Sequence, residues 1–153
     1  MKIIGSYPKT RLRRLRKSKF LRDLVSENSL SNNDLILPIF IREGKGKIES
    51  IKSMPGIKRY TVDKLPIILK QVKKLKIPMV ALFPYIPNVK KDNFGKEALN
   101  PNNIICRSLR LIKKKFPTIG TMCDVALDPY TSHGHDGILK KNKILNDETI
   151  EIL

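Results

Sequence analysis

The stretch that decides the fold is IGTMCDVALDPYTSHGHDG, residues 119–137. Its first half, up to Leu127, is an apolar run that contains the acid Asp124. Asp128 ends the run, and a loop with two histidines, the acid Asp136 and two glycines follows directly. Burying a carboxylate costs free energy unless it is paired, protonated or bound to a metal. Three carboxylates in one short stretch therefore indicate a functional site. A strand that ends in such a cluster is typical of the catalytic end of an α/β enzyme.

Two further segments, residues 35–41 and 79–85, have the composition of strands that are covered on both faces. Apolar residues at helical spacing predict a helix over residues 61–76, with Thr61 as its N-cap, and another over residues 104–116. With residues 119–127 as a third strand, strands and helices alternate at a period of roughly 40 residues, which predicts right-handed crossovers and a parallel sheet.

The other segments are more polar. Pro38 is awkward in a central strand because it donates no ladder hydrogen bond. Turn residues predict a long connection over 42–60, a loop over 86–101 and a turn over 137–143. Asn146 is predicted to cap a helix that begins in the last residues, so the sequence resembles a fragment. Three strands alone would also leave an exposed sheet edge.

Length and composition limit the class of protein. The chain has 153 residues and 41% hydrophobic content, which suffices for one domain with a real core. Its apolar runs are far shorter than the ~20 residues that span a bilayer, and no apolar segment follows the basic N-terminus as in a secretory signal. Cys106 and Cys123 have a spacing that fits neither a disulfide scaffold nor a zinc knuckle. We therefore expect a cytoplasmic protein without a membrane partner.

The net charge is +17, and much of it lies at the N-terminus. Residues 1–22 contain nine Lys and Arg side chains and no acid, and a short helix is predicted at residues 18–26. Such an arm could bind nucleic acid, but aromatic residues are few and none interleaves the basic ones as a stacking platform. An arm that packs on an acidic partner subunit, or a solvated tail, explains the charge better than nucleic-acid binding.

The acidic residues are predicted to share one face of the third strand. Asp124 and Asp128 lie four residues apart, so their side chains would point the same way, with Ala126 leaving room for a ligand. Asp136 could fold back over the same pocket. The carboxylates could bind a hard cation such as Mg²⁺, or they could act with a lysine as proton shuttles and charge partners for an amine substrate.

Structural roles compete with these chemical ones. Asp124 could simply accept hydrogen bonds from backbone amides of the loop. His133 and His135 could be metal ligands, but a role in holding the loop through hydrogen bonds is the simpler interpretation.

The motifs resemble those of porphobilinogen synthase, also called δ-aminolevulinic acid dehydratase. The resemblance runs over most of the chain, in family order and spacing. Its parts are residues 11–16 with Phe20, residues 24–28, residues 35–40 with Glu43 and Gly44, residues 53–57, residues 81–84 and residues 124–137. The last of these motifs is highly specific.

The resemblance implies a TIM (β/α)₈ barrel. Residues 1–30 would form a basic N-terminal arm and first helix, and residues 31–153 the first half of the barrel, since a full barrel needs about 250 residues. It implies a lyase that condenses two 5-aminolevulinate molecules to porphobilinogen, on the way to haem and other tetrapyrroles. It also implies a homo-octamer in which the arm wraps a neighbouring subunit. The two lysines that form Schiff bases in the family lie beyond Leu153, so we expect this chain alone to be inactive.

The resemblance also assigns the site. It implies Asp124, Asp128 and Asp136 as the catalytic carboxylates, with Asp128 and Asp136 near the amino group of the second substrate. It implies Phe83 and Ser132 as residues of the substrate pocket.

The family has two forms, which differ in the metal that they use. A zinc form has three cysteines, which would fall at Ala126, Asp128 and Asp136, and none is a cysteine here, so catalytic zinc is not expected. The chain resembles the aspartate-rich form, often stimulated by Mg²⁺, whose usual allosteric ligand is a glutamate outside these 153 residues. No metal ligand is therefore assigned. The alternative function is a small basic protein that binds RNA or docks to a partner through its arm.

Overall fold

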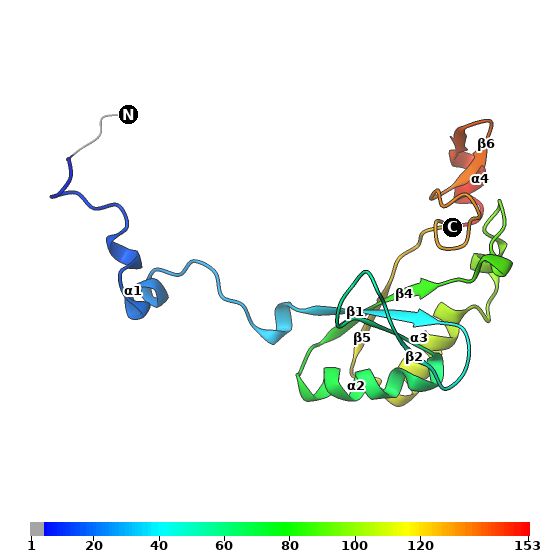
Figure 1. Ribbon diagram of the computed structural model, residues 1–153, viewed down its shortest axis with the longest axis horizontal. Coiled ribbons are helices and arrows are strands. Elements are labelled where there is room, and N and C mark those ends of the chain that lie inside the picture. The colour runs from blue at the N-terminus through cyan, green and yellow to red at the C-terminus, as the bar shows by residue number, and fades with distance from the viewer. Residues whose placement is uncertain (1–4) are drawn as a thin grey trace. The chain divides into compact units, whose positions relative to one another are not determined.

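The structure is a computed structural model that describes residues 5–153. Its contacts divide the chain into two units, with the boundary between Ser31 and Asn32. The N-terminal unit contains a 3₁₀ turn, Arg14–Arg16, and the helix α1, Lys19–Leu24 (Figure 1). The short helix predicted at residues 18–26 is confirmed.

The second unit is built on a five-stranded sheet in the order β2-β3-β1-β4-β5. Strands β3, β1, β4 and β5 run parallel, and β2 pairs antiparallel with β3. The bounds are Ile36–Arg42 for β1, Ile48–Ser50 for β2, Lys58–Tyr60 for β3, Met79–Tyr85 for β4 and Gly120–Cys123 for β5. The predicted α/β class with a parallel sheet is confirmed.

Two helices lie on one side of this sheet (Figure 1). They are α2, Leu65–Lys74, which follows a 3₁₀ turn, and α3, Ile104–Lys115. Asn103 caps α3 by accepting a hydrogen bond from the Cys106 amide at 2.9 Å. The helices and the central strands share one buried core, which contains Ile39, Ile41, Leu65, Leu69, Val72, Val80, Leu82, Ile104 and Ile112. Each fully buried aliphatic side chain of this size contributes about 1.5–3 kcal/mol to folding.

The opposite face of the sheet is open in the described chain. Phe40 and Phe83 meet there with ring centroids 5.8 Å apart, and Phe83 and Met122 are 39% and 46% exposed. The prediction that the strands are covered on both faces is therefore wrong for this face. Apolar strands with helices on one side only are typical of a barrel wall, whose other face lines the interior.

The structure corrects two predictions, for the connection over residues 42–60 and for Thr61, and it explains how a strand accommodates Pro38. The connection over residues 42–60 contains the β2–β3 pair, with Ile48 opposite Tyr60. Thr61 does not cap α2, because its buried hydroxyl exchanges hydrogen bonds with the Lys47 backbone at 3.1 Å. Pro38 is tolerated because β3 pairs with β1 only at Phe40 and Ile41, so Pro38 has a ladder partner on one side only.

The end of the chain forms a hairpin and a short helix. Strands β6, Ile138–Lys140, and β7, Lys143–Leu145, are joined by two residues with left-handed φ of 47° and 59°, where the sequence predicted only a turn. Helix α4 spans Asn146–Ile150, and its N-cap is Leu145 rather than Asn146. Within residues 5–153, no helix is long and apolar enough to cross a membrane.

Candidate active site

The loops after β4 and β5 lie side by side at one edge of the sheet (Figure 1). Strand β5 ends at Cys123, so Asp124 begins the loop rather than lying inside the strand. The chain then turns, because the amides of Tyr130 and Thr131 donate to the Leu127 carbonyl at 2.8 and 3.0 Å. The prediction that Asp124 and Asp128 share a strand face is therefore wrong. We call residues 124–137 the acidic loop.

Asp124 lines a hollow of about 200 Å³ on the open face of the sheet, together with Phe83. The two residues lie next to each other because β4 and β5 are paired. Leu82 pairs with Cys123, Phe83 follows Leu82, and Asp124 follows Cys123. The other lining residues are Ala81, Leu82, Met122 and Cys123. The hollow thus combines one carboxylate with apolar walls and lies where parallel α/β folds bind ligands.

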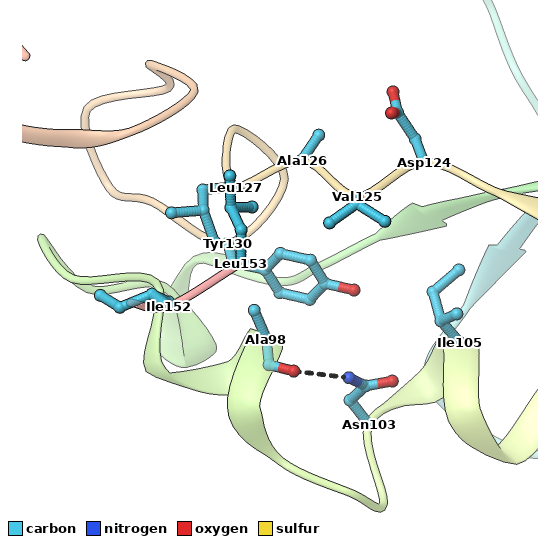
Figure 2. A pocket seen from close by; sticks show the side chains of 10 residues that line it. All are labelled: Ala98, Asn103, Ile105, Asp124, Val125, Ala126, Leu127, Tyr130, Ile152 and Leu153. Carbon is cyan, nitrogen blue, oxygen red and sulfur yellow. Dashed lines mark hydrogen bonds between the residues drawn. The ribbon is translucent and has the colours of Figure 1, made fainter. Parts of the chain in front are cut away.

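A second pocket, of about 150 Å³, lies on the other side of the acidic loop (Figure 2). Figure 2 shows the ring of Tyr130 between the loop backbone and the residues near Asn103, and the Asp124 carboxylate pointing away from that ring. Burial raises the pKa of Tyr130 to about 12, so its hydroxyl stays protonated at neutral pH. Asp124 lines both spaces, but its carboxylate points away from the Tyr130 ring, so the hollow with Phe83, and not the pocket behind the loop, is the candidate site.

The pKa of Asp128 depends on the other two carboxylates of the acidic loop. Asp128 is exposed at the surface, but partial desolvation raises its pKa above the ordinary aspartate value, and the negative charges of Asp136 and Asp124 raise the pKa further. Asp124 and Asp136 therefore lie near enough to Asp128 for their charges to act on it, and we call these three residues the carboxylate cluster.

The raised pKa of Asp128 predicts a pH dependence of stability. Because the pKa is higher in the folded than in the unfolded chain, the ionised carboxylate destabilises the fold increasingly as the pH rises from the ordinary aspartate range through the raised pKa. Asp128→Asn should therefore raise the thermal midpoint at neutral pH, and the gain should vanish in acid, where both forms are uncharged. Asp147→Asn, at the start of α4, should show no such gain. An equal midpoint for parent and Asp128→Asn at neutral pH would contradict the cluster.

Asp136 has a structural contact as well as its charge. Its Oδ1 accepts a hydrogen bond from the Leu127 amide at 2.6 Å, which closes the acidic loop across nine residues. The sequence suggested such a backbone contact for Asp124, and the structure assigns it to Asp136.

The double role of Asp136 can be separated with two variants. Asp136→Ala leaves the amide of the buried Leu127 without its acceptor and should cost about 1–3 kcal/mol in the free energy of unfolding. Asp136→Asn keeps an acceptor oxygen and should lose little stability, although it removes the charge. Urea denaturation of both variants measures the difference. Equal losses would show that the hydrogen bond to Leu127 contributes nothing.

The His133 ring holds the loop through hydrogen bonds, as the simpler interpretation of the sequence expected, whereas His135 takes part through its backbone amide and carbonyl. The His135 amide donates to Nδ1 of His133 at 3.2 Å, and Nε2 of His133 lies 3.4 Å from the Asn93 carbonyl oxygen. The buried Thr131 hydroxyl donates to the His135 carbonyl at 2.9 Å.

The loop before α3 supports the acidic loop, which was not predicted from the sequence. The Ser132 amide donates to the Asp92 carbonyl at 2.9 Å, and the Asp92 amide donates to the Tyr130 carbonyl at 3.3 Å. Ser132, predicted to line the substrate pocket, also donates its hydroxyl to Oδ1 of Asn93. The turn sequence Asp92-Asn93-Phe94-Gly95 is the signal that could have shown an ordered loop here.

Among residues 5–153, no group of three or more His, Cys, Asp or Glu side chains could hold a metal ion. Asp136 also directs one oxygen at the Leu127 amide, so that oxygen is already occupied. What the cluster can do is exchange protons, because of the raised pKa of Asp128, and attract a cationic amine.

Comparison with known proteins identifies the family. The family model described as delta-aminolevulinic acid dehydratase matches residues 9–153. Delta-aminolevulinic acid dehydratases of Bradyrhizobium diazoefficiens and Chlamydia pneumoniae are 51% and 44% identical to the chain, over 94% and 93% of its length. The matches span 40% and 43% of those relatives, so the chain covers about two fifths of their length.

A solved structure agrees. The crystal structure of delta-aminolevulinic acid dehydratase from Toxoplasma gondii ME49, in complex with the reaction product porphobilinogen, matches 94% of this chain and 41% of that one. The TM-score is 0.86 and the sequence identity is 34%. The chain belongs to the delta-aminolevulinic acid dehydratase family, and its fold is the N-terminal part of the TIM barrel of that family.

Proposed function

We propose that this chain contributes the carboxylate-bearing part of the active site of a porphobilinogen synthase, a lyase that condenses two molecules of 5-aminolevulinate. The observation that carries the proposal is the acidic loop after β5, in which Asp124 lines the hollow of Phe83 and the charges of Asp124 and Asp136 act on Asp128, in a chain of this family.

The chemistry follows from the charges. An amino group of 5-aminolevulinate arrives as an ammonium ion, and three nearby carboxylates attract it. Asp128, whose pKa is raised, is a better proton acceptor than an ordinary aspartate. It can take one proton from the ammonium group, which leaves a neutral carboxylic acid and a neutral, nucleophilic amine. The lysines that form Schiff bases with the substrates are expected outside these 153 residues.

Other predictions remain part of this proposal. The basic arm would join neighbouring subunits of a homo-octamer, in keeping with nine cationic residues and no acid among residues 1–22. Mg²⁺ would act allosterically through a glutamate outside these 153 residues, and catalytic zinc is not proposed. A cytoplasmic location fits the two free cysteines, Cys106 and Cys123.

A chimera tests the proposed function. The chain is joined in frame to the part of the Bradyrhizobium diazoefficiens relative that lies beyond the matched region, and is expressed in a bacterium without its own dehydratase. We expect the chimera to restore growth without added porphobilinogen, and the chain alone to fail because it lacks the Schiff-base lysines. A folded chimera that does not restore growth would contradict the proposed function, and rescue by the chain alone would contradict the expected division of the site.

A further inference from the structure

Glu43, directly after β1, is the centre of a charged network that lies outside the acidic loop. Its Oε1 accepts a hydrogen bond from Nζ of Lys90 at 2.9 Å, and its Oε2 accepts one from the Arg107 guanidinium at 2.6 Å. Lys90 also pairs with Glu97 at 3.1 Å. The network therefore ties the end of β1 to α3 and to both sides of the loop between β4 and α3.

The network favours the charged forms of Glu43 and Lys90. Burial alone would raise the pKa of Glu43, but the hydrogen bonds and charges of Arg107 and Lys90 outweigh burial and lower it below the ordinary value. In return, the hydrogen bonds from Lys90 to Glu43 and Glu97 raise the pKa of Lys90. The Glu43 side chain is only 23% exposed, so salt screens these contacts less than those of an ordinary surface ion pair.

The segment that the network holds is the one that supports the acidic loop. Lys90 is two residues from Asp92, whose backbone forms the bridge to Thr131 and Ser132. On the other side, Glu97 is two residues from Gly95, which has a left-handed φ of 63°. A Cβ atom at Gly95 would lie 3.4 Å from Leu127 and 3.7 Å from Thr131.

Glu43 acts through this segment and not on a ligand. It lines neither the hollow of Phe83 nor the pocket behind the acidic loop. Loops that carry functional side chains need rigid support, because a displacement of about 1 Å can cost on the order of 100-fold in rate. The contacts from Glu43 through Lys90 and Asp92 to Ser132 supply that support.

We propose that Glu43 is a positioning residue, which uses Lys90 and Arg107 to hold the loop before α3 against the acidic loop and so orients the carboxylate cluster. The effect on catalysis rests on the proposed function, whereas the effect on the order of the acidic loop does not.

Amide hydrogen exchange of the 153-residue chain tests the structural part. Glu43→Gln should speed exchange at the amides of Leu127, Thr131 and Ser132 about tenfold or more, because these amides are protected by contacts that the network supports. Glu49→Gln is the matched control, since Glu49 of β2 also pairs with arginines, but these are Arg42 at the end of β1 and Arg59 of β3 rather than residues of α3 or of the loop before it. Unchanged exchange at the three amides in Glu43→Gln would overturn the proposal.

Kinetics of the chimera test the catalytic part. Glu43→Gln should lower kcat/KM about 10- to 100-fold at a nearly unchanged thermal midpoint, Glu49→Gln should not, and Glu43→Asp, which keeps the charge, should recover part of the loss. Lys90→Gln removes the same contact from its other side, should also lower kcat/KM, and takes the place of Glu43→Gln if that variant does not fold. Parent-like kcat/KM in both Glu43→Gln and Lys90→Gln would overturn the positioning role. A folded but inactive parent chimera would contradict the proposed function instead, and the exchange measurement would still decide the role of Glu43.

Discussion

Replacing Asp128 by alanine in the chimera is expected to lower the turnover of 5-aminolevulinate about 100-fold or more, the usual effect of losing a positioned proton acceptor. The expectation rests on the raised pKa of Asp128, which partial desolvation and the charges of Asp136 and Asp124 cause. Asp128→Ala removes both the proton acceptor and one third of the negative charge that attracts an amine. Because the carboxylate also destabilises the folded chain at neutral pH, the variant should not unfold more easily than the parent.

The combination of a large kinetic loss and an undiminished thermal midpoint separates a catalytic from a structural role for Asp128. Asp147→Ala provides the control, since Asp147 is an exposed acid in the first turn of α4. Its turnover should stay within about twofold of the parent, with at most a small loss of helix stability. If Asp128→Ala turns over 5-aminolevulinate as fast as Asp147→Ala, the acidic loop does not take part in the reaction.

Replacing Gly137 by alanine is expected to cost about 2–4 kcal/mol in the free energy of unfolding, because strain and overpacking add. Gly137 ends the acidic loop with a φ of 150°, which side-chain residues rarely adopt. A Cβ atom there would lie 2.7 Å from Cγ2 of Ile144 and 3.1 Å from Oγ1 of Thr149. Thr149 cannot move freely, because it is buried, accepts a hydrogen bond from the Ile138 amide at 2.9 Å and donates to the Leu145 carbonyl.

Gly134→Ala is the matched control within the same loop. Gly134 has a left-handed φ of 70°, but a Cβ atom there would meet nothing within 4 Å. Its substitution should therefore cost about 1–2 kcal/mol from backbone strain alone. Urea denaturation of the two variants measures the difference. Equal losses would mean that the acidic loop is not packed against the β6–β7 hairpin and α4 as described.

Hydrophobic periodicity predicted the elements that bury an apolar face. Leu69 and Val72 of α2 and Ile112 of α3 recur at helical spacing, and all three are fully buried. The predicted strand over residues 119–127 is too long, since β5 ends at Cys123. Leu127 continues the apolar run and is buried, but it lies in a turn. An apolar, buried residue can therefore belong to a packed loop as well as to a strand.

Short and polar strands were missed for a related reason. Strands β2 and β3 have three residues each, too few for an alternating pattern, and the turn of the β6–β7 hairpin is Lys141-Asn142, without the glycine that usually marks such a turn. Of the candidate site, residue types and their spacing pointed to the three carboxylates, and the family resemblance pointed to Phe83, which lines the hollow with Asp124. The support from Asp92 was not predicted, because its contacts with Tyr130 and Ser132 are made by the backbone, which any residue shares.

Product formation by the purified chimera tests most directly whether the acidic loop takes part in porphobilinogen synthesis. Supplied with 5-aminolevulinate, the chimera is predicted to release porphobilinogen, and the same protein with Asp128→Ala is predicted to release it about 100-fold more slowly or not at all. A folded chimera that forms no porphobilinogen, or an Asp128→Ala variant that forms it at the parent rate, would contradict the claim that the acidic loop is part of a porphobilinogen synthase active site.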